Sequence, residues 1–311
     1  MANGAFSLME IRPMRWFQLA LLLVLGSILL QAAQGQVQLQ GKLPDKFFVE
    51  LKSEYKRTFK SPKGEIKDRT ESTQLLGITV LKSNADETRV EIKIESFKEV
   101  VTDDAGKKKE NTHPEWQGTT VQVTLDAGMN VTKVDGIDEI VKKSDPKGTA
   151  KKETKAYQLE YYENVVRNWA SQVFVSLPAK AVRTGDKWDQ KALRTLGPYG
   201  NLKLTKELVY QGTETSGGQE LNKVSFTTTH AFSPIKRWDA FPFKVSRASV
   251  NKAEYSGTLY FDAGAGRFVR CDAKELRDLV MTLNYDALDR EVRIHDVGTS
   301  SMRFHEKNPM P

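Results

Sequence analysis

The sequence predicts a mainly β protein with one long helix, in which the strands form two curved antiparallel sheets shaped like half-barrels. Three observations lead to this prediction. Apolar and polar residues alternate with a period of two through much of the chain, which is typical of strands with one buried face. Two of these strands end in the same Asp-Ala-Gly turn. A single long stretch follows the period of an α-helix instead.

The first half reads as an antiparallel meander. Within residues 47–60, Val49, Leu51, Ser53 and Tyr55 alternate with charged residues, which predicts a half-buried strand. The turn "SPKGE" follows, where Pro and Gly supply the backbone angles. Further strands are expected over 72–82, 88–101 and 119–126, with one face packed and the other in water.

A helical period appears twice in the middle of the chain. A short helix is expected over 136–145. In the longer one, apolar side chains step by three and four positions, at Leu159, Tyr162, Val166, Trp169 and Val173, and Pro178 is expected to end it. Such a stripe packs against a membrane surface, a partner or a sheet. Glutamates dilute its lysines, which favours a helix lying across the sheet.

The second half returns to alternating strands and repeats the turn of the first. The stretch "TLDAG" ends at Gly128 and "YFDAG" ends at Gly264. Asp bonds its own backbone and Gly accepts positive φ, so each turn is expected to join two strands of one sheet. The shared pattern raises the hypothesis of a distant internal duplication. The predicted organisation is a signal peptide at 1–35, an N-terminal β lobe at 36–148, a connecting amphipathic helix at 149–177 and a C-terminal β lobe at 178–311.

Residues 1–35 have the features of a secretory signal peptide. Arg12 and Arg15 precede the apolar run "LALLLVLGSILL", and the cut is predicted between Gly35 and Gln36, with Ala33 at the −3 position. The alternative is a single membrane anchor, for which the run is short. We therefore expect a secreted or periplasmic protein with no transmembrane span once the signal is cleaved.

Composition sets further limits. The apolar fraction of 39% is enough for a core. The one cysteine, Cys271, cannot form an intramolecular disulfide. It lies in an alternating run, so it is expected to be a small core residue. The low cysteine content is typical of a bacterial exported protein. The net charge of +7 gathers in lysine-rich stretches at 107–109 and 142–155. These either attract an anionic surface or are solvated turns, and we favour the latter; no nucleic-acid partner is expected.

The order of these segments carries a resemblance. The chain has a signal peptide, a β meander with "VTLDAGMNVTKVDG", an amphipathic helix, "LPAKAVRTGDKW" and finally "GTLYFDAGAGRFV". In this it resembles a family of exported bacterial proteins of unknown function, whose members have a Leu-Pro…Gly-Asp-x-Trp segment after a helix and an Asp-containing hairpin late in the chain. The resemblance implies a fold and an exported location. It implies no activity and no site residues.

Few motifs point to chemistry. The histidines 113, 230, 295 and 305 lack the spacing of a zinc site, and neither a nucleophile elbow nor a phosphate loop occurs. "DAGAGR" is followed by a strand pattern, so the helix N-terminus of a phosphate site is missing. We predict no catalytic residue, no metal and no cofactor. Paired carboxylates that meet only in space leave a hydrolase open as an alternative.

The most suggestive stretch for binding is "HAFSPIKRWDAFPF", at residues 230–243. Aromatic residues on an irregular segment beside cations are able to line the mouth of a cavity for an amphiphilic ligand. The alternative, which we favour, is a crossover segment that its aromatic residues pin to the core. The candidate ligand-binding residues are Phe232, Lys236, Arg237, Trp238, Phe241 and Phe243.

The leading hypothesis is an exported non-enzymatic protein that binds an apolar or amphiphilic molecule of the cell envelope, such as a lipid. It rests on analogy with curved sheets that enclose apolar space. The alternatives are a cell-surface scaffold or protein-interaction module and, third, the hydrolase. A binder should have an apolar cavity beneath the long helix and the segment from Phe232 to Phe243, whereas a scaffold should have a filled core. The sequence names no ligand, partner or oligomeric state.

Overall fold

A computed structural model describes residues 36–39, 41–233, 241–285 and 288–310. The fold below is that of the unit Gln38–Pro311. Within its described residues the chain is mainly β with one long helix, which confirms the predicted fold class. The candidate residues Lys236, Arg237 and Trp238, and the predicted signal peptide, lie outside the described residues.

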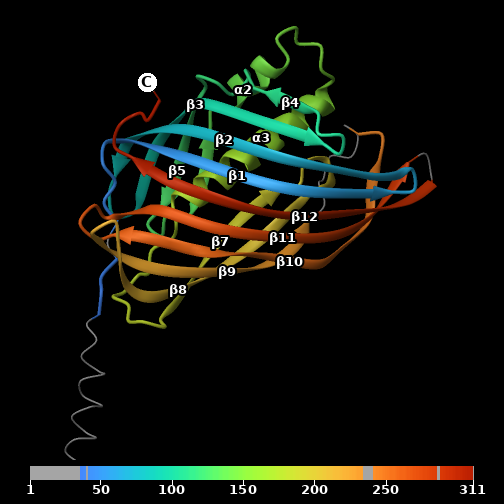
Figure 1. The fold of residues 1–311 in the computed structure, drawn as a ribbon. Helices are drawn as coiled ribbons and strands as arrows, with labels where there is room; N and C mark the ends of the chain where they lie inside the picture. The colour runs from blue at the N-terminus through green and yellow to red at the C-terminus, as the bar shows by residue number, and fades with distance from the viewer. Residues whose placement is uncertain (1–35, 40, 234–240, 286–287, 311) are drawn as a thin grey trace, which may run out of the picture. The chain divides into compact units, whose positions relative to one another are not determined.

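The strands form a single antiparallel sheet of 12 strands (Figure 1). Its order is β6-β5-β3-β2-β1-β12-β11-β10-β9-β8-β7, and β4 pairs with β3 off this path. The strands are β1 (Lys46–Ser61), β2 (Gly64–Ser83), β3 (Glu87–Asp103), β4 (Lys108–Asn111), β5 (Thr120–Asp126), β6 (Val131–Asp135), β7 (Lys187–Thr195), β8 (Asn201–Ser216), β9 (Gln219–Ser233), β10 (Lys244–Asp262), β11 (Arg267–Tyr285) and β12 (Leu288–His305).

The prediction of two separate sheets is therefore wrong. The halves of the chain do form neighbouring sets of strands, but β1 pairs with β12 from Phe48↔His305 to Lys60↔Arg293 and joins them into one sheet. This pairing connects residues more than two hundred positions apart, so no local sequence pattern predicts it. The internal duplication stays a prediction.

Both Asp-Ala-Gly turns are hairpins, as expected, but the positive φ falls on Met129 and Gly266 and not on the glycine of either Asp-Ala-Gly triplet. Asp126 closes the turn between β5 and β6, and its Oδ1 accepts hydrogen bonds from the backbone N–H groups of Gly128 and Asn130 at 2.9 and 2.8 Å. Asp262 closes the turn between β10 and β11 and accepts from the N–H of Ala265 at 2.9 Å. The first hairpin ends the sheet at β6, whereas the second lies in its interior.

Alternation along β1 defines the two faces of the sheet. Phe47, Val49 and Leu51 are buried on one face, which we call the inner face, and Lys52 and Lys56 on the opposite, outer face are exposed. The inner face carries apolar side chains at both ends of the strands. One end includes Leu76, Ile78 and Phe261; the other is a cluster of Phe243, Leu279, Met281, Leu283, Val292 and Ile294.

Two α-helices of the described residues follow β6, and the longer of them runs along the inner side of the sheet (Figure 1). α2 (Ile137–Ser144) is short. α3 (Lys152–Val173) is the long helix, and it ends at Val173, before Pro178. Val166 and Trp169 of its apolar stripe are buried, which supports a helix packed on the sheet, although Leu159 remains exposed.

α3 contacts both edge strands of the sheet, β6 and β7. Arg167 of the helix donates to the carbonyl of Val131 on β6 at 3.1 Å. On the other side, Trp188 and Gln190 of β7 donate to the carbonyls of Ser176 and Phe174, just beyond the helix, at 2.8 and 2.9 Å. Backbone groups at the helix end and at the sheet edge thereby gain partners, which unpaired edges need.

The sheet curls strongly around its inner face. Arg194 of β7 forms an ion pair with Glu275 of β11 and a hydrogen bond with the hydroxyl of Tyr55 of β1, although β7 is separated from both strands in the sheet order. Side chains of strands so far apart meet only when the sheet bends back toward itself. The curl and α3 together enclose the inner face.

Candidate functional site

Between the two apolar ends of the inner face lie two neighbouring rows of polar side chains, which we call the polar belt. The register of paired strands places Gln190, Lys206, Thr228, Tyr255, Glu275, Gly298, Tyr55 and Thr70 in or beside the first row. The second row contains Arg277, Asp296, Arg57 and Asp68. Such a belt is unusual because buried charges lose hydration and must be paired.

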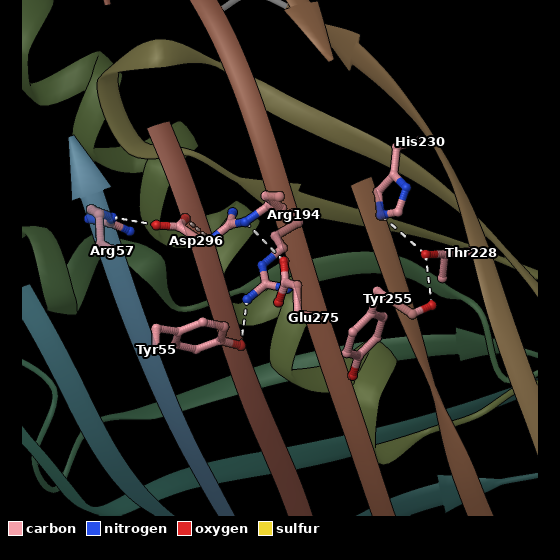
Figure 2. Close-up of polar contacts among 9 residues, drawn as sticks. Tyr55, Arg57, Arg194, Thr228, His230, Tyr255, Glu275 and Asp296 are labelled. Carbon is pink, nitrogen blue, oxygen red and sulfur yellow. Dashed lines mark hydrogen bonds and ion pairs between the residues drawn. The ribbon is translucent and has the colours of Figure 1, made fainter. Parts of the chain in front are cut away.

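Two buried carboxylates are each held by two arginines (Figure 2). Glu275, which is 4% exposed, forms ion pairs with Arg194 and, at 3.0 Å, with Arg277. Asp296, which is 1% exposed, pairs with Arg277 at 2.6 Å and with Arg57 at 2.9 Å. Burial lowers the pKa of Arg194, but the charge of Glu275 and the interactions with Tyr55 and Tyr255 together outweigh it. The pKa of Arg194 is therefore raised, and the guanidinium stays charged.

Tyr55 extends this network through its hydroxyl, which accepts a hydrogen bond from Arg194 at 2.8 Å (Figure 2). Burial raises the pKa of Tyr55, so the phenol keeps its proton. The ring lies over Gly298 of the neighbouring strand, and a Cβ at that position would clash with the ring and with the carbonyl of Glu54. Glycine is therefore required for Tyr55 to reach Arg194.

His230 forms a second polar branch (Figure 2). Its Nε2 lies 3.1 Å from Oγ1 of Thr228, whose hydroxyl donates to the carbonyl of Tyr255 at 3.0 Å. A hydroxyl that donates to a carbonyl accepts from the ring, so Nε2 carries the proton. Burial lowers the pKa of His230, which favours the neutral ring.

A cavity of about 550 Å³ lies between α3 and the polar belt. One part of its lining is charged and carries Arg57, Arg194, Arg277 and Asp296. The adjoining part is apolar, with Leu279, Ile294, Leu196, Pro198 and the ring of Tyr199. Tyr161 and Asn168 of α3 cover it. A second space of about 170 Å³ shares Tyr55, Arg194 and Asn168 with it. The cavity is therefore amphiphilic.

A separate apolar crevice near the end of α3 is much smaller. It is lined by Phe47, Phe174, Phe261, Met302 and other apolar groups, with a volume of about 30 Å³. A space of this size holds one or two waters by volume. It is a packing gap in the apolar end of the core, so the amphiphilic cavity is the stronger candidate for a ligand site.

Three of the sequence-predicted binding residues are described, and one of them contacts a residue of the cavity lining. Phe243 is buried and stacks on Tyr199, which lines the cavity, with ring centroids 5.8 Å apart. Phe241 packs edge-on against Tyr157 of α3 at 4.6 Å. Phe232 lies on β9 beside Gly200. None of the three is among the cavity-lining residues, and their role in binding stays a prediction.

Sequence reasoning missed the residues of the polar belt itself. The signal was present in the stretch "KELRDLVM" of β11. There the charged residues Glu275 and Arg277 occupy the same alternate positions, and so the same face, as the buried residues Leu279 and Met281. Two charges in phase with buried apolar residues indicate an inward-facing charged pair. Cys271, also on β11, is half-buried, and burial raises the pKa of its thiol to about 11.

Within the described ranges, no group of three or more His, Cys, Asp or Glu side chains is arranged to hold a metal ion. The same part of the chain contains no helix with the length and apolar character needed to cross a membrane.

Comparisons with known proteins add no assignment. No protein-family model matches the chain, and no curated protein matches its sequence. Among solved structures, a chain titled "Lipid-protein interactions in lipovitellin" aligns with a TM-score of 0.43 and 11% identity, over 86% of this chain and 26% of that one. DynF from the dynemicin biosynthesis pathway of Micromonospora chersina aligns with a TM-score of 0.23 and 8% identity, over 89% and 88%.

A putative outer membrane lipoprotein-sorting protein domain from Vibrio parahaemolyticus aligns with a TM-score of 0.17 and 9% identity, over 84% of this chain and 87% of that one. The chain spans about a quarter of the length of the lipovitellin chain. At TM-scores this low, none of these likenesses establishes a shared fold or a shared function.

Proposed function

We propose that this is an exported protein that binds one amphiphilic molecule in the cavity beneath α3. The observation that carries the proposal is the cavity's two-part lining, with charged groups in one part and apolar groups in the adjoining part. The apolar part of a ligand would lie against Leu279 and Ile294, and its polar part against the polar belt. Export is supported by the signal-like features of residues 1–35.

The size of the cavity supports this proposal. Pockets for small organic ligands span about 300–1,000 Å³, and the cavity of about 550 Å³ falls in this range. A core filled only for stability rarely leaves voids larger than a water molecule. A space of this volume under a helix therefore supports a binder over a scaffold with a filled core.

The polar belt also supports a functional interior. Replacing a buried ion pair by apolar residues of similar volume is often neutral or stabilising, so such pairs are weak evidence for a stability role. Proteins depart from apolar cores mainly at functional sites. The sequence left both an apolar and an amphiphilic ligand open. The polar belt favours the amphiphilic ligand, because a purely apolar one would leave the charged wall of the cavity without partners.

Filling the cavity should abolish binding. Asn168→Trp places a large ring where α3 faces both cavity spaces. We expect the fluorescent amphiphile anilinonaphthalene sulfonate to bind the native protein at one site, and the variant to bind it at least about tenfold more weakly, a loss of about 1.4 kcal/mol. Fluorescence titration measures both affinities.

Lys155→Trp is the matched control, since Lys155 is exposed on the same helix. It adds the same ring outside the cavity and should leave the affinity unchanged. Equal weakening by both variants, or no binding to the native protein, would contradict the proposed function.

A further inference from the structure

The polar belt leaves one cation and one carboxylate with unused hydrogen-bonding capacity at the cavity wall. Glu275 is already paired with Arg194 and Arg277, and Asp296 with Arg277 and Arg57. These two carboxylates are therefore taken by protein partners. The charged groups that remain for a ligand lie on β1, β2 and β3.

Arg57 is the unused cation. Its Nε donates to Asp296 at 2.9 Å, while its two terminal nitrogens donate no hydrogen bond to any residue of the described part of the chain. The side chain lines the cavity and is 46% exposed. A guanidinium holds its donors in a fixed plane that suits a carboxylate or phosphate. Arg57 can thus meet an acidic group of a ligand while it remains anchored to Asp296.

Asp68 is the unused carboxylate, and it lies directly opposite Arg57 in the β1–β2 register. Both side chains line the cavity. Asp68 accepts one long hydrogen bond, from the hydroxyl of Thr70 at 3.4 Å, and forms no ion pair with a described residue. Opposed residues of an antiparallel pair lie about 4.5–5.5 Å apart at Cα. Arg57 does not close onto Asp68, because its Nε is directed to Asp296.

A second carboxylate strengthens the acidic side of this wall. Glu99 of β3 also lines the cavity, where it accepts a hydrogen bond from Asn111 at 3.2 Å. A ligand with only an acidic group would be held by Arg57 but repelled by Asp68 and Glu99. A ligand with only a basic group would be held by Asp68 and Glu99 but repelled by Arg57. A head group that carries both charges meets both sides of the wall.

We infer that the ligand has a zwitterionic head group on an apolar chain, with its acidic part at Arg57 and its basic part at Asp68. This inference rests on the proposed function and names the class of ligand for the same cavity. The apolar chain extends toward Leu279 and Ile294. Charge complementarity of this kind selects among ligands more than it adds raw affinity.

The test compares three lipids with the same single acyl chain: lysophosphatidylethanolamine, which is zwitterionic, lysophosphatidic acid, which is anionic, and a neutral monoacylglycerol. Calorimetric titration of the exported protein, below the micelle concentration of each lipid, gives the three affinities. The zwitterion should bind at least about tenfold more tightly than either other lipid, because it alone offers a group of opposite charge to both Arg57 and Asp68.

Two variants assign the charges. Arg57→Met should bring the zwitterion close to the affinity of the neutral lipid. Asp68→Asn should remove most of the advantage of the zwitterion over the anionic lipid. Lys56→Met and Glu54→Gln are the controls, because both residues lie on the outer face of β1, and they should change none of the affinities.

The outcomes separate this inference from the proposed function. If the three lipids bind equally, or if Asp68→Asn leaves the preference intact, the cavity still binds amphiphiles but the zwitterionic head is overturned. If none of the three binds the folded native protein, the proposed function fails and the inference fails with it.

Discussion

Glu275→Gln is expected to lower the free energy of unfolding by about 3–5 kcal/mol, because it removes one partner from a buried charge network. The side chain is 4% exposed and holds Arg277, itself 5% exposed, together with Arg194. Glutamine keeps the shape but not the charge. Two guanidinium groups then share the single remaining buried carboxylate, Asp296, and Arg194 is left with Tyr55 alone.

Urea denaturation at neutral pH measures this loss. The control is Glu54→Gln on the outer face, where the carboxylate pairs with Arg69 and both side chains are exposed by more than 40%. Solvent screens such exposed pairs, so they contribute little to stability. Similar losses in both variants would mean that the polar belt does not act as a buried network.

Lys206→Met is expected to raise the free energy of unfolding by about 1–3 kcal/mol at about pH 7, since a pKa shift of one unit corresponds to about 1.4 kcal/mol. Lys206 is 4% exposed, and burial lowers its pKa from 10.5 to about 8. Among the described residues it has no salt-bridge partner, and its Nζ lies 5.1 Å from the centre of the Phe226 ring. Methionine removes the buried charge and keeps an apolar chain of similar length.

The pH dependence gives the sign of this effect. Below about pH 8, Lys206 is protonated in both the folded and the unfolded chain, so the full cost of the buried charge is present. Between about pH 8 and 10.5 the unfolded chain binds more protons, and stability therefore rises with pH. The advantage of Lys206→Met should accordingly be largest near neutral pH and shrink as pH rises through this window.

Urea denaturation of both proteins at about pH 7 and about pH 9.5 measures the two differences. Lys203→Met, at an exposed position of the same strand, should leave stability unchanged at both pH values. A Lys206→Met variant that is less stable than the native protein at neutral pH would show that the ammonium has a compensating partner. A difference that does not change with pH would contradict the lowered pKa.

The sequence predicted what is encoded locally. Alternation along residues 47–60 gave β1 and its buried face. The two Asp-Ala-Gly turns gave hairpins, because each aspartate accepts hydrogen bonds from the backbone of its own turn. The step pattern of Val166 and Trp169 gave the buried side of α3. Each of these features depends on neighbours in sequence.

The joining of the sheet could not be predicted in this way. Arg57 and Asp296 are 239 positions apart, yet they face each other where β1 pairs with β12. The sequences of β1 and β12 contain no signal that tells a strand at the edge of a sheet from one that pairs with a distant strand. The expectation of two sheets followed from treating the long helix as a boundary, whereas the helix packs under a continuous sheet.

The candidate site was missed for a related reason. Arg194 comes from β7, Glu275 from β11 and Tyr55 from β1, and they meet only because the sheet curls. Sequence reasoning favoured the aromatic segment at 230–243, whose described members Phe241 and Phe243 pack against Tyr157 and Tyr199 and are not among the cavity-lining residues. Charges in phase with buried positions, as at Arg277, are the signal that would have found the site.

The most direct test of the proposed function is native mass spectrometry of the protein, purified gently after export into a bacterial periplasm. We expect a mass above that of the polypeptide alone, which returns to the chain mass on denaturation and corresponds to one bound amphiphile. A bare chain mass, together with no uptake of added lysolipid by the folded protein, would contradict the proposal that the cavity beneath α3 is a ligand site.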